Sequence, residues 1–283
     1  MPARDKCDDK KGAGAMNLEG SWSRAVRDSV EQPSAAAPAT DSRGVSCVVC
    51  AYNEADRIQN ILDVIVGHPG LAEVIVVNDG STDETEALLR SYPTIRVLSH
   101  TPNRGKTYAL SRGIAAARCE NLMLLDADLA GVTAADIDAL AAPVLRGEAE
   151  VSISLRSNSL WLYRRIGLDF VSGERVAPKW LLQGAVEAMQ RLPRWGGEVY
   201  MNQIFIRQAC RIAVVKWPRV LNIRKYQKAG FWRGSLAEAK MIADAASVLT
   251  PVGLVRQNLQ MLKLVRRRTW RSRVLGFAQR VVS

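Results

Sequence analysis

"ENLMLLDADLAG", residues 120–131, joins a run of apolar side chains to two carboxylates. The Leu-Met-Leu-Leu run at 122–125 has no polar side chain on either face, as expected for a strand buried inside a parallel sheet. Asp126 and Asp128 follow directly, and side chains two residues apart on a strand point to the same side. The stretch therefore predicts a buried strand at 121–126 that ends in two neighbouring acidic groups.

An alternation of apolar strands and amphipathic helices surrounds this stretch. Strands that are apolar throughout, separated by helices, are typical of a mostly parallel central sheet covered by helices on both faces. We therefore expect the α/β class. The predicted strands are 45–51, 73–78, 95–99, 121–126 and 150–155, and the predicted helices include 58–66, 106–117 and one capped by Thr133. Beyond them, 158–192 and 235–270 are predicted to be mainly helical, and 198–206 and 211–217 to be extended.

Composition divides the chain into three predicted parts. Residues 1–43 are rich in Ala, Pro, Ser and Gly and are expected to be a disordered leader. Residues 44–240 are expected to form the α/β domain, with a mainly helical C-terminal extension at 241–283. No apolar run is long enough for a membrane span, and no signal peptide is recognised.

The net charge of +11 is concentrated in the C-terminal third. Eight Lys or Arg and no acid lie between Glu198 and Glu238, and eight more with no acid follow Asp244. Such a surface suits an anionic substrate or an acidic lipid surface, or is simply solvated. The cysteines Cys47 and Cys50 lie within an apolar strand and face opposite ways, so they are interpreted as buried thiols of a cytoplasmic protein.

Polar clusters follow three of the predicted strands. They are Tyr52-Asn53-Glu54, Asp79-Gly80-Ser81 and Asp126-Ala127-Asp128. The carboxyl ends of parallel strands share one edge of the sheet, where ligands of open α/β sheets bind. A divalent cation could neutralise Asp126 and Asp128 and bridge to phosphate oxygens, although a solvated turn is the plainer alternative for two such acids.

Four segments together resemble the family 2 glycosyltransferases of GT-A fold. They are "CAYNEADRI", "VIVVNDGSTDET", "NRGKTYAL" and "LMLLDADL", and the resemblance is close over about 44–155 and looser to about 240. It implies a nucleotide-sugar site in which Asp79 binds the base and Lys106 approaches the nucleotide or its phosphates. The resemblance further implies that Asp126 and Asp128 contact the sugar, the ribose and a metal ion. The loop along the nucleotide would be formed by Ala51, Tyr52 and Glu54.

The next segments resemble the acceptor half of a subset of the same family. In "RWGGEVYMNQ", Glu198 is the candidate contact to the acceptor or the transferred sugar and the only candidate base, or else a buried structural acid paired to an arginine. In "LNIRKYQK", relatives often have His-x-x-Lys-x-x-Lys, and Asn222 occupies the His position. Asn222 would then be a weaker metal ligand. The cations expected to bind phosphate on the acceptor or nucleotide are Arg224, Lys225 and Lys228.

The C-terminal segment predicts a basic amphipathic helix. Its apolar stripe is Val255, Leu259, Leu262 and Val265, and its basic side chains are Arg256, Lys263 and Arg267. This pattern favours peripheral contact with an anionic membrane, while packing of the helix on the domain is the alternative.

The sequence as a whole predicts a glycosyltransferase of the hexosyltransferase type. We expect a UDP- or GDP-sugar donor, Mg²⁺ or Mn²⁺, and an anionic acceptor, with a lipid-linked phosphate at the inner membrane surface as one candidate. Nucleic acid is not an expected partner. The alternatives are a transferase with a soluble acceptor, of the glucosyl-3-phosphoglycerate synthase kind, and a non-catalytic sugar-nucleotide-binding protein.

Overall fold

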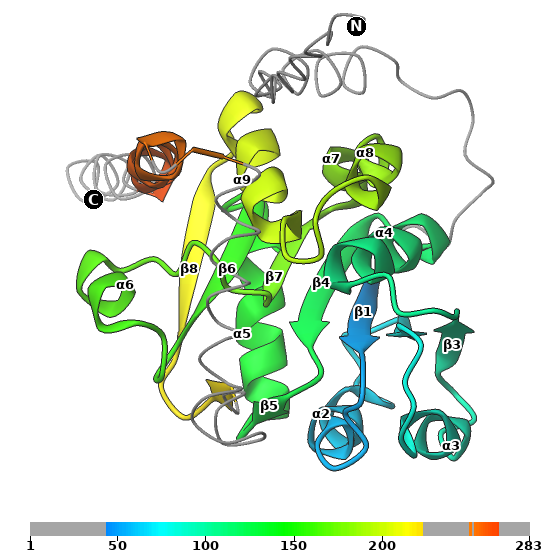
Figure 1. Ribbon diagram of the computed structural model, residues 1–283. Coiled ribbons are helices and arrows are strands. Elements are labelled where there is room, and N and C mark those ends of the chain that lie inside the picture. Colours follow the sequence, from blue (N-terminus) through cyan, green and yellow to red (C-terminus); the bar gives the residue numbers. More distant parts are fainter. Residues whose placement is uncertain (1–43, 223–248, 251, 266–283) are drawn as a thin grey trace, which may run out of the picture.

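The computed structural model describes residues 44–222, 249–250 and 252–265 (Figure 1). The predicted leader and the predicted phosphate ligands Arg224, Lys225 and Lys228 lie outside the described residues, as does Arg267. Within the described part of the chain, no helix combines the length and the apolar character needed to cross a membrane.

A seven-stranded sheet forms the centre of the fold, in the order β3-β2-β1-β4-β7-β6-β8. The first four strands of this order pair in parallel, and β6 and β8 also pair in parallel. The strands are β1 (Val45–Ala51), β2 (Glu73–Asn78), β3 (Arg96–Ser99), β4 (Asn121–Asp126), β6 (Val151–Arg156), β7 (Arg175–Pro178) and β8 (Ile212–Trp217). The predicted mostly parallel sheet is confirmed.

Helices cover both faces of this sheet, also as predicted. Side chains of β1 alternate between the two cores, since Val48 packs into one and Val49 into the other. The first core contains residues of α4 (Lys106–Ala116), α7 (Lys179–Gln183), α8 (Val186–Gln190) and α9 (Gly197–Arg207). The second contains residues of α2 (Ile58–Ile65), α3 (Thr85–Arg90) and α5 (Ala134–Leu145).

Two segments differ from the prediction. The region expected to be mainly helical, 158–192, contains α6 (Trp161–Ile166) but also β7, which runs antiparallel between β4 and β6. Residues 198–206, expected to be extended, lie in α9. Eight of the eleven residues of α9 are buried, and they include the polar Glu198 and Asn202, so polar side chains do not mark only the solvent-facing side and the helical period is obscured.

Residues 252–265 are helical, but only two of the four residues of the predicted apolar stripe pack against the domain. Gln257, Met261 and Leu264 are the side chains buried against the domain. Of the predicted stripe, Leu262 and Val265 pack against the first core. The other two, Val255 and Leu259, are exposed. The helix therefore packs on the domain and still presents apolar side chains to solvent.

Replacing Gly113 should destabilise the fold. A β-carbon at Gly113 of α4 would overlap the Val48 side chain of β1, so Gly113→Ala should cost about 1–3 kcal/mol of unfolding free energy. Urea denaturation measures this cost. As a control, Gly184 is exposed and has helical dihedral angles, so Gly184→Ala should be neutral or slightly stabilising. Equal effects of the two substitutions would contradict close packing of α4 on β1.

Candidate active site

The loops after β1 and β2 hold each other through backbone hydrogen bonds. Asn53 N donates to Ser81 Oγ at 3.0 Å, and Glu54 N donates to Thr85 Oγ1 at 2.9 Å. The Asn53 side chain returns the contact by accepting from Thr82 N at 2.8 Å. These hydrogen bonds fix the loop that carries Tyr52. The Tyr52 ring is exposed at the carboxyl edge of the sheet, where the resemblance places the nucleotide.

Two other residues of the predicted nucleotide loop are less available to a ligand. Ala51 is buried, and its carbonyl accepts from Asp79 N at 2.9 Å. The Glu54 carboxylate lies 2.7 Å from Arg57 Nε within the same loop. Tyr52 is therefore the side chain of this loop that is best placed to contact a nucleotide.

Asp79 anchors the loop between β3 and α4. One carboxylate oxygen accepts from His100 Nε2 at 2.8 Å and from Arg104 N at 2.7 Å. The other accepts from Asn103 Nδ2 at 3.0 Å and from Gly105 N at 2.8 Å. Two donors on each oxygen fill the acceptor capacity of the carboxylate. The contact with a base predicted from the resemblance would require the release of at least one of these donors.

Gly105 is needed where this loop enters α4. Its φ is +98°, a conformation that side chains rarely adopt, and a β-carbon there would also collide with the Arg194 backbone. The turn delivers the next residue, Lys106, to the middle of the site. The "NRGK" motif is thus a short turn whose backbone amides bind Asp79 and whose last residue carries the charge.

Lys106 forms ion pairs with two of the predicted site acids. Its Nζ lies 2.6 Å from Asp126 Oδ1 and 2.7 Å from Glu198 Oε1. All three side chains are largely buried, with the Glu198 side chain 7% exposed. The structure therefore brings together α4, the end of β4 and the start of α9. The cation paired with Glu198 is a lysine and not the arginine considered as the alternative from sequence.

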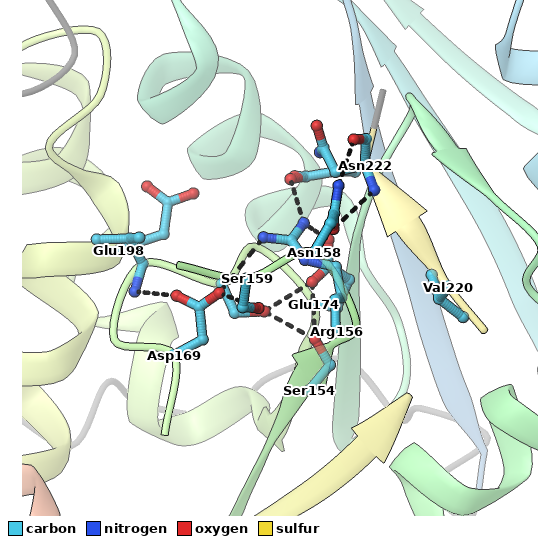
Figure 2. Close-up of polar contacts among 12 residues, drawn as sticks. Ser154, Arg156, Asn158, Ser159, Asp169, Glu174, Glu198, Val220 and Asn222 are labelled. Carbon is cyan, nitrogen blue, oxygen red and sulfur yellow. Dashed lines mark hydrogen bonds and ion pairs between the residues drawn. The ribbon is translucent and has the colours of Figure 1, made fainter. Parts of the chain in front are cut away.

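Arg156 at the end of β6 is a site residue that the sequence reasoning missed. Its guanidinium lies 2.8 Å from Glu174 Oε1, 3.6 Å from Asp169 Oδ2 and 3.9 Å from Asp126 Oδ2. Figure 2 shows Arg156 at the centre of this network, with Glu198 on one side and Asn222 on the other. The sequence held a signal for it, since Arg156 directly follows the predicted strand 150–155.

These charges shift the pKa values of the central pair in opposite directions. Burial by itself would raise the pKa of the Asp126 carboxyl, but the charges of Lys106 and Arg156 outweigh it and hold that pKa below its ordinary value. Burial would lower the pKa of Lys106, but Asp126 and Glu198 raise it above its ordinary value. Both groups are therefore charged at neutral pH. Since the Asp126 pKa is depressed, the stability that it contributes is present above about pH 3.9 and is lost on acidification below it.

Asp126 is neutralised by the chain's own cations, which the sequence reasoning did not foresee. That reasoning assigned the neutralising charge to a divalent cation. Asp128 has a different neighbour, because Asn222 Nδ2 donates to Asp128 Oδ1 at 2.7 Å. The short sheet of β5 (Leu129–Ala130) and β9 (Leu221–Asn222) creates this contact by pairing Leu129 with Asn222.

The donor set at this edge suits a hard cation that also binds phosphate. Among the described residues, no group of three or more His, Cys, Asp or Glu side chains could hold a metal ion. Mg²⁺ and similar ions are commonly held by one or two carboxylates together with substrate phosphates and water. Asp128, with the Asn222 amide beside it, meets that requirement, and Asp126 lies on the same strand end.

Gly173, in the turn before β7, lies directly against Asp126. A β-carbon at Gly173 would overlap the Asp126 carboxylate. We expect Gly173→Ala to lower the unfolding free energy by about 1–3 kcal/mol and to disturb the ion pair with Lys106. Urea denaturation of a double-mutant cycle with Asp126→Ala isolates the clash, because the cost of Gly173→Ala should shrink once the carboxylate is gone. Additive costs would show that the two residues do not touch.

Comparison with known proteins finds similarity to glycosyltransferases. Residues 46–165 match the model of glycosyl transferase family 2. A dolichyl-phosphate beta-glucosyltransferase of Drosophila melanogaster is 38% identical over 99 residues, which cover 30% of this chain and 30% of that protein. A poly-beta-1,6-N-acetyl-D-glucosamine synthase of Staphylococcus epidermidis is 35% identical over 90 residues, which cover 30% of this chain and 22% of that protein.

The fold also matches solved structures over most of its length. Glucosyl-3-phosphoglycerate synthase of Mycobacterium tuberculosis, solved with Mn²⁺, UDP-glucose and glycerol 3-phosphate, aligns with a TM-score of 0.57 and 26% identity. That alignment covers 73% of this chain and 80% of the synthase. By contrast, the matches to curated relatives span between 22% and 50% of those proteins. Residues 46–165 therefore resemble glycosyl transferase family 2, within a domain of GT-A fold.

Proposed function

We propose that this protein is a metal-dependent glycosyltransferase that moves a sugar from a nucleotide diphosphate sugar to an anionic acceptor. The observation that carries the proposal is the convergence of Lys106, Asp126 and Glu198 at the carboxyl edge of the parallel strands, with Asp128 two residues beyond Asp126. Cationic and carboxylate groups that meet in one largely buried site can bind both a diphosphate and the metal ion that accompanies it.

Asp128, Asp126 and Asn222 are the residues proposed to hold Mg²⁺ or Mn²⁺. The bound ion would supply positive charge to the departing nucleoside diphosphate. Lys106 is already held by the Asp126 carboxylate, so its ammonium group is oriented for the phosphates before the donor arrives. Support for this donor class comes from the synthase of Mycobacterium tuberculosis, which was solved with Mn²⁺ and UDP-glucose.

Glu198 is proposed to face the acceptor. Its carboxylate lies 2.7 Å from Lys106 Nζ and would accept a proton from an attacking hydroxyl. If the attacking group is already a phosphate oxygen, no base is needed.

The anionic acceptor has two candidate sources. A lipid-linked phosphate is supported by the similarity to dolichyl-phosphate glucosyltransferases. A small soluble phosphate is supported by the synthase structures that contain phosphoglyceric acid or glycerol 3-phosphate. The basic residues Arg224, Lys225 and Lys228 are proposed to contact the phosphate in either case. A screen of nucleotide sugars with Mn²⁺ and Mg²⁺, followed by acceptor trials, tests the activity and distinguishes a transferase from a non-catalytic binding protein.

Removing Asp128 should separate metal-dependent from metal-independent donor binding. Asp128→Ala should abolish the gain in UDP or GDP affinity that Mn²⁺ provides, because the carboxylate that holds the ion is lost. Asp79→Ala should weaken nucleotide binding even without metal, because the loop that delivers Lys106 loses its anchor. Calorimetry measures both effects. Equal binding by Asp128→Ala and the unmodified chain in Mn²⁺ would exclude the proposed metal site.

The Asn222 position can be tested by introducing histidine, the residue type that the resemblance leads us to expect there. Asn222→His should tighten Mn²⁺ binding, because imidazole is a stronger ligand than an amide for this ion and the position lies beside Asp128. Asn222→Ala is the control and should not tighten binding. If Asn222→His folds normally and leaves Mn²⁺ affinity unchanged in calorimetry, the position is not a ligand position.

A further inference from the structure

α6 presents large apolar side chains to solvent. Trp161 is 72% exposed, and its neighbours Leu160 and Leu162 are 53% and 52% exposed. The opposite side of the helix is fixed, because the Tyr163 ring packs edge-on against Phe170 at 5.5 Å between centroids. The exposed side chains are therefore the outward face of a helix with a defined orientation.

Both ends of the α6 segment belong to the candidate active site. Arg156, before the helix, pairs with Asp126, and Asp169, after the helix, lies 3.6 Å from Arg156. The Ser159 hydroxyl donates to Asp169 Oδ2 at 2.6 Å, which joins the chain before α6 to the chain after it. Figure 2 shows Arg156, Ser159 and Asp169 meeting at this point. The outward face of α6 is thus held at a fixed position relative to Asp126.

The charge around this face is positive. Arg164 and Arg165 of α6 are exposed, and the sequence from 157 to 168 contains no acid. In Figure 1, α6 and the helix at 252–265 both lie at the β8 end of the sheet. That second helix also exposes apolar side chains, Val255 and Leu259, beside the cations Arg256 and Lys263.

We propose that α6 docks this protein on an anionic lipid bilayer, with Trp161 and Leu162 entering the interface and Arg164 and Arg165 contacting lipid phosphates. Tryptophan and leucine next to arginine have the amphipathic character that suits the boundary between headgroups and acyl chains. Docking itself does not depend on the proposed transferase activity. Only its purpose rests on that proposal, because docking would bring the site to an acceptor held in the membrane.

A second copy of the chain is a less suitable occupant of this face. Stable protein interfaces bury about 800 Å² on each partner. One tryptophan and two leucines supply only a few hundred Å², roughly half of that area at most. Bilayer contact needs no such area, because a few interfacial apolar side chains and arginines are sufficient for reversible binding.

Vesicle sedimentation of the full chain tests the proposal without any sugar donor. The full chain should sediment with vesicles of phosphatidylcholine mixed with phosphatidylglycerol, and poorly with phosphatidylcholine alone. Trp161→Ala should lower the partition coefficient about tenfold through the lost apolar contact. Arg164→Gln with Arg165→Gln should lower it by about tenfold or more at low salt.

Matched controls come from another part of the surface. Trp180 of α7 is 65% exposed, so Trp180→Ala removes an equally accessible tryptophan and should leave the partition unchanged. Arg191→Gln with Arg207→Gln, both exposed, removes the same charge elsewhere and should have the smaller effect. Trp161→Phe should keep binding but remove most of the blue shift in tryptophan fluorescence that vesicles induce.

Three outcomes would overturn the proposal. Equal losses for the α6 variants and their controls would mean that general charge or other segments bind the vesicles. No sedimentation of the full chain with anionic vesicles at low salt would exclude docking altogether. A dimer that Trp161→Ala converts to a monomer, with vesicle binding unchanged, would identify α6 as a contact between copies. Nucleotide binding by the same variants, measured in solution, should be normal, so failure of docking is separable from failure of the transferase proposal.

Discussion

The ion pairs of Lys106 with Asp126 and Glu198 connect three elements of the fold that are separate in the chain. They join α4, β4 and α9 in a largely buried setting, where an unpaired charge would be costly. Removal of one partner of a buried pair typically costs about 3–5 kcal/mol, because the remaining charge is left without compensation. The arrangement of these three elements is therefore constrained by charge as well as by packing.

Strand β6 and the turn before β7 supply further contacts to the Asp126 carboxylate. β7 runs antiparallel between β4 and β6, and the turn before it brings Gly173 against the Asp126 carboxylate. β6 ends at Arg156, which shares Asp126 with Lys106 and is itself neutralised by Glu174. Glu174 is fully buried and also accepts from two serine hydroxyls, Ser154 and Ser172. The acidic strand end is thus surrounded by donors supplied from both halves of the sheet.

This arrangement has a consequence for ligand binding. Asp126 is charged and already paired, so a donor diphosphate with its metal ion would enter a site where the positive and negative groups are in place beforehand. Such preorganisation lowers the reorganisation that accompanies charge development in a reaction. The loop that carries Lys106 is fixed by the four hydrogen bonds to Asp79, so the position of the ammonium group depends on a residue that the resemblance assigned to base recognition.

The sequence by itself determined the five leading strands, most of their helices and the positions of the acids at the strand ends. These features are local, because apolar runs and helical spacing need only neighbouring residues to be recognised. Only the tertiary structure decided that β7 inserts antiparallel, that α9 is a helix, and that Arg156 and Lys106 share Asp126. It also decided that Asn222 contacts Asp128 and that Trp161 is exposed. Each of these depends on contacts between distant segments, and the burial of polar Glu198 and Asn202 within α9 obscured the periodic pattern that would have revealed the helix.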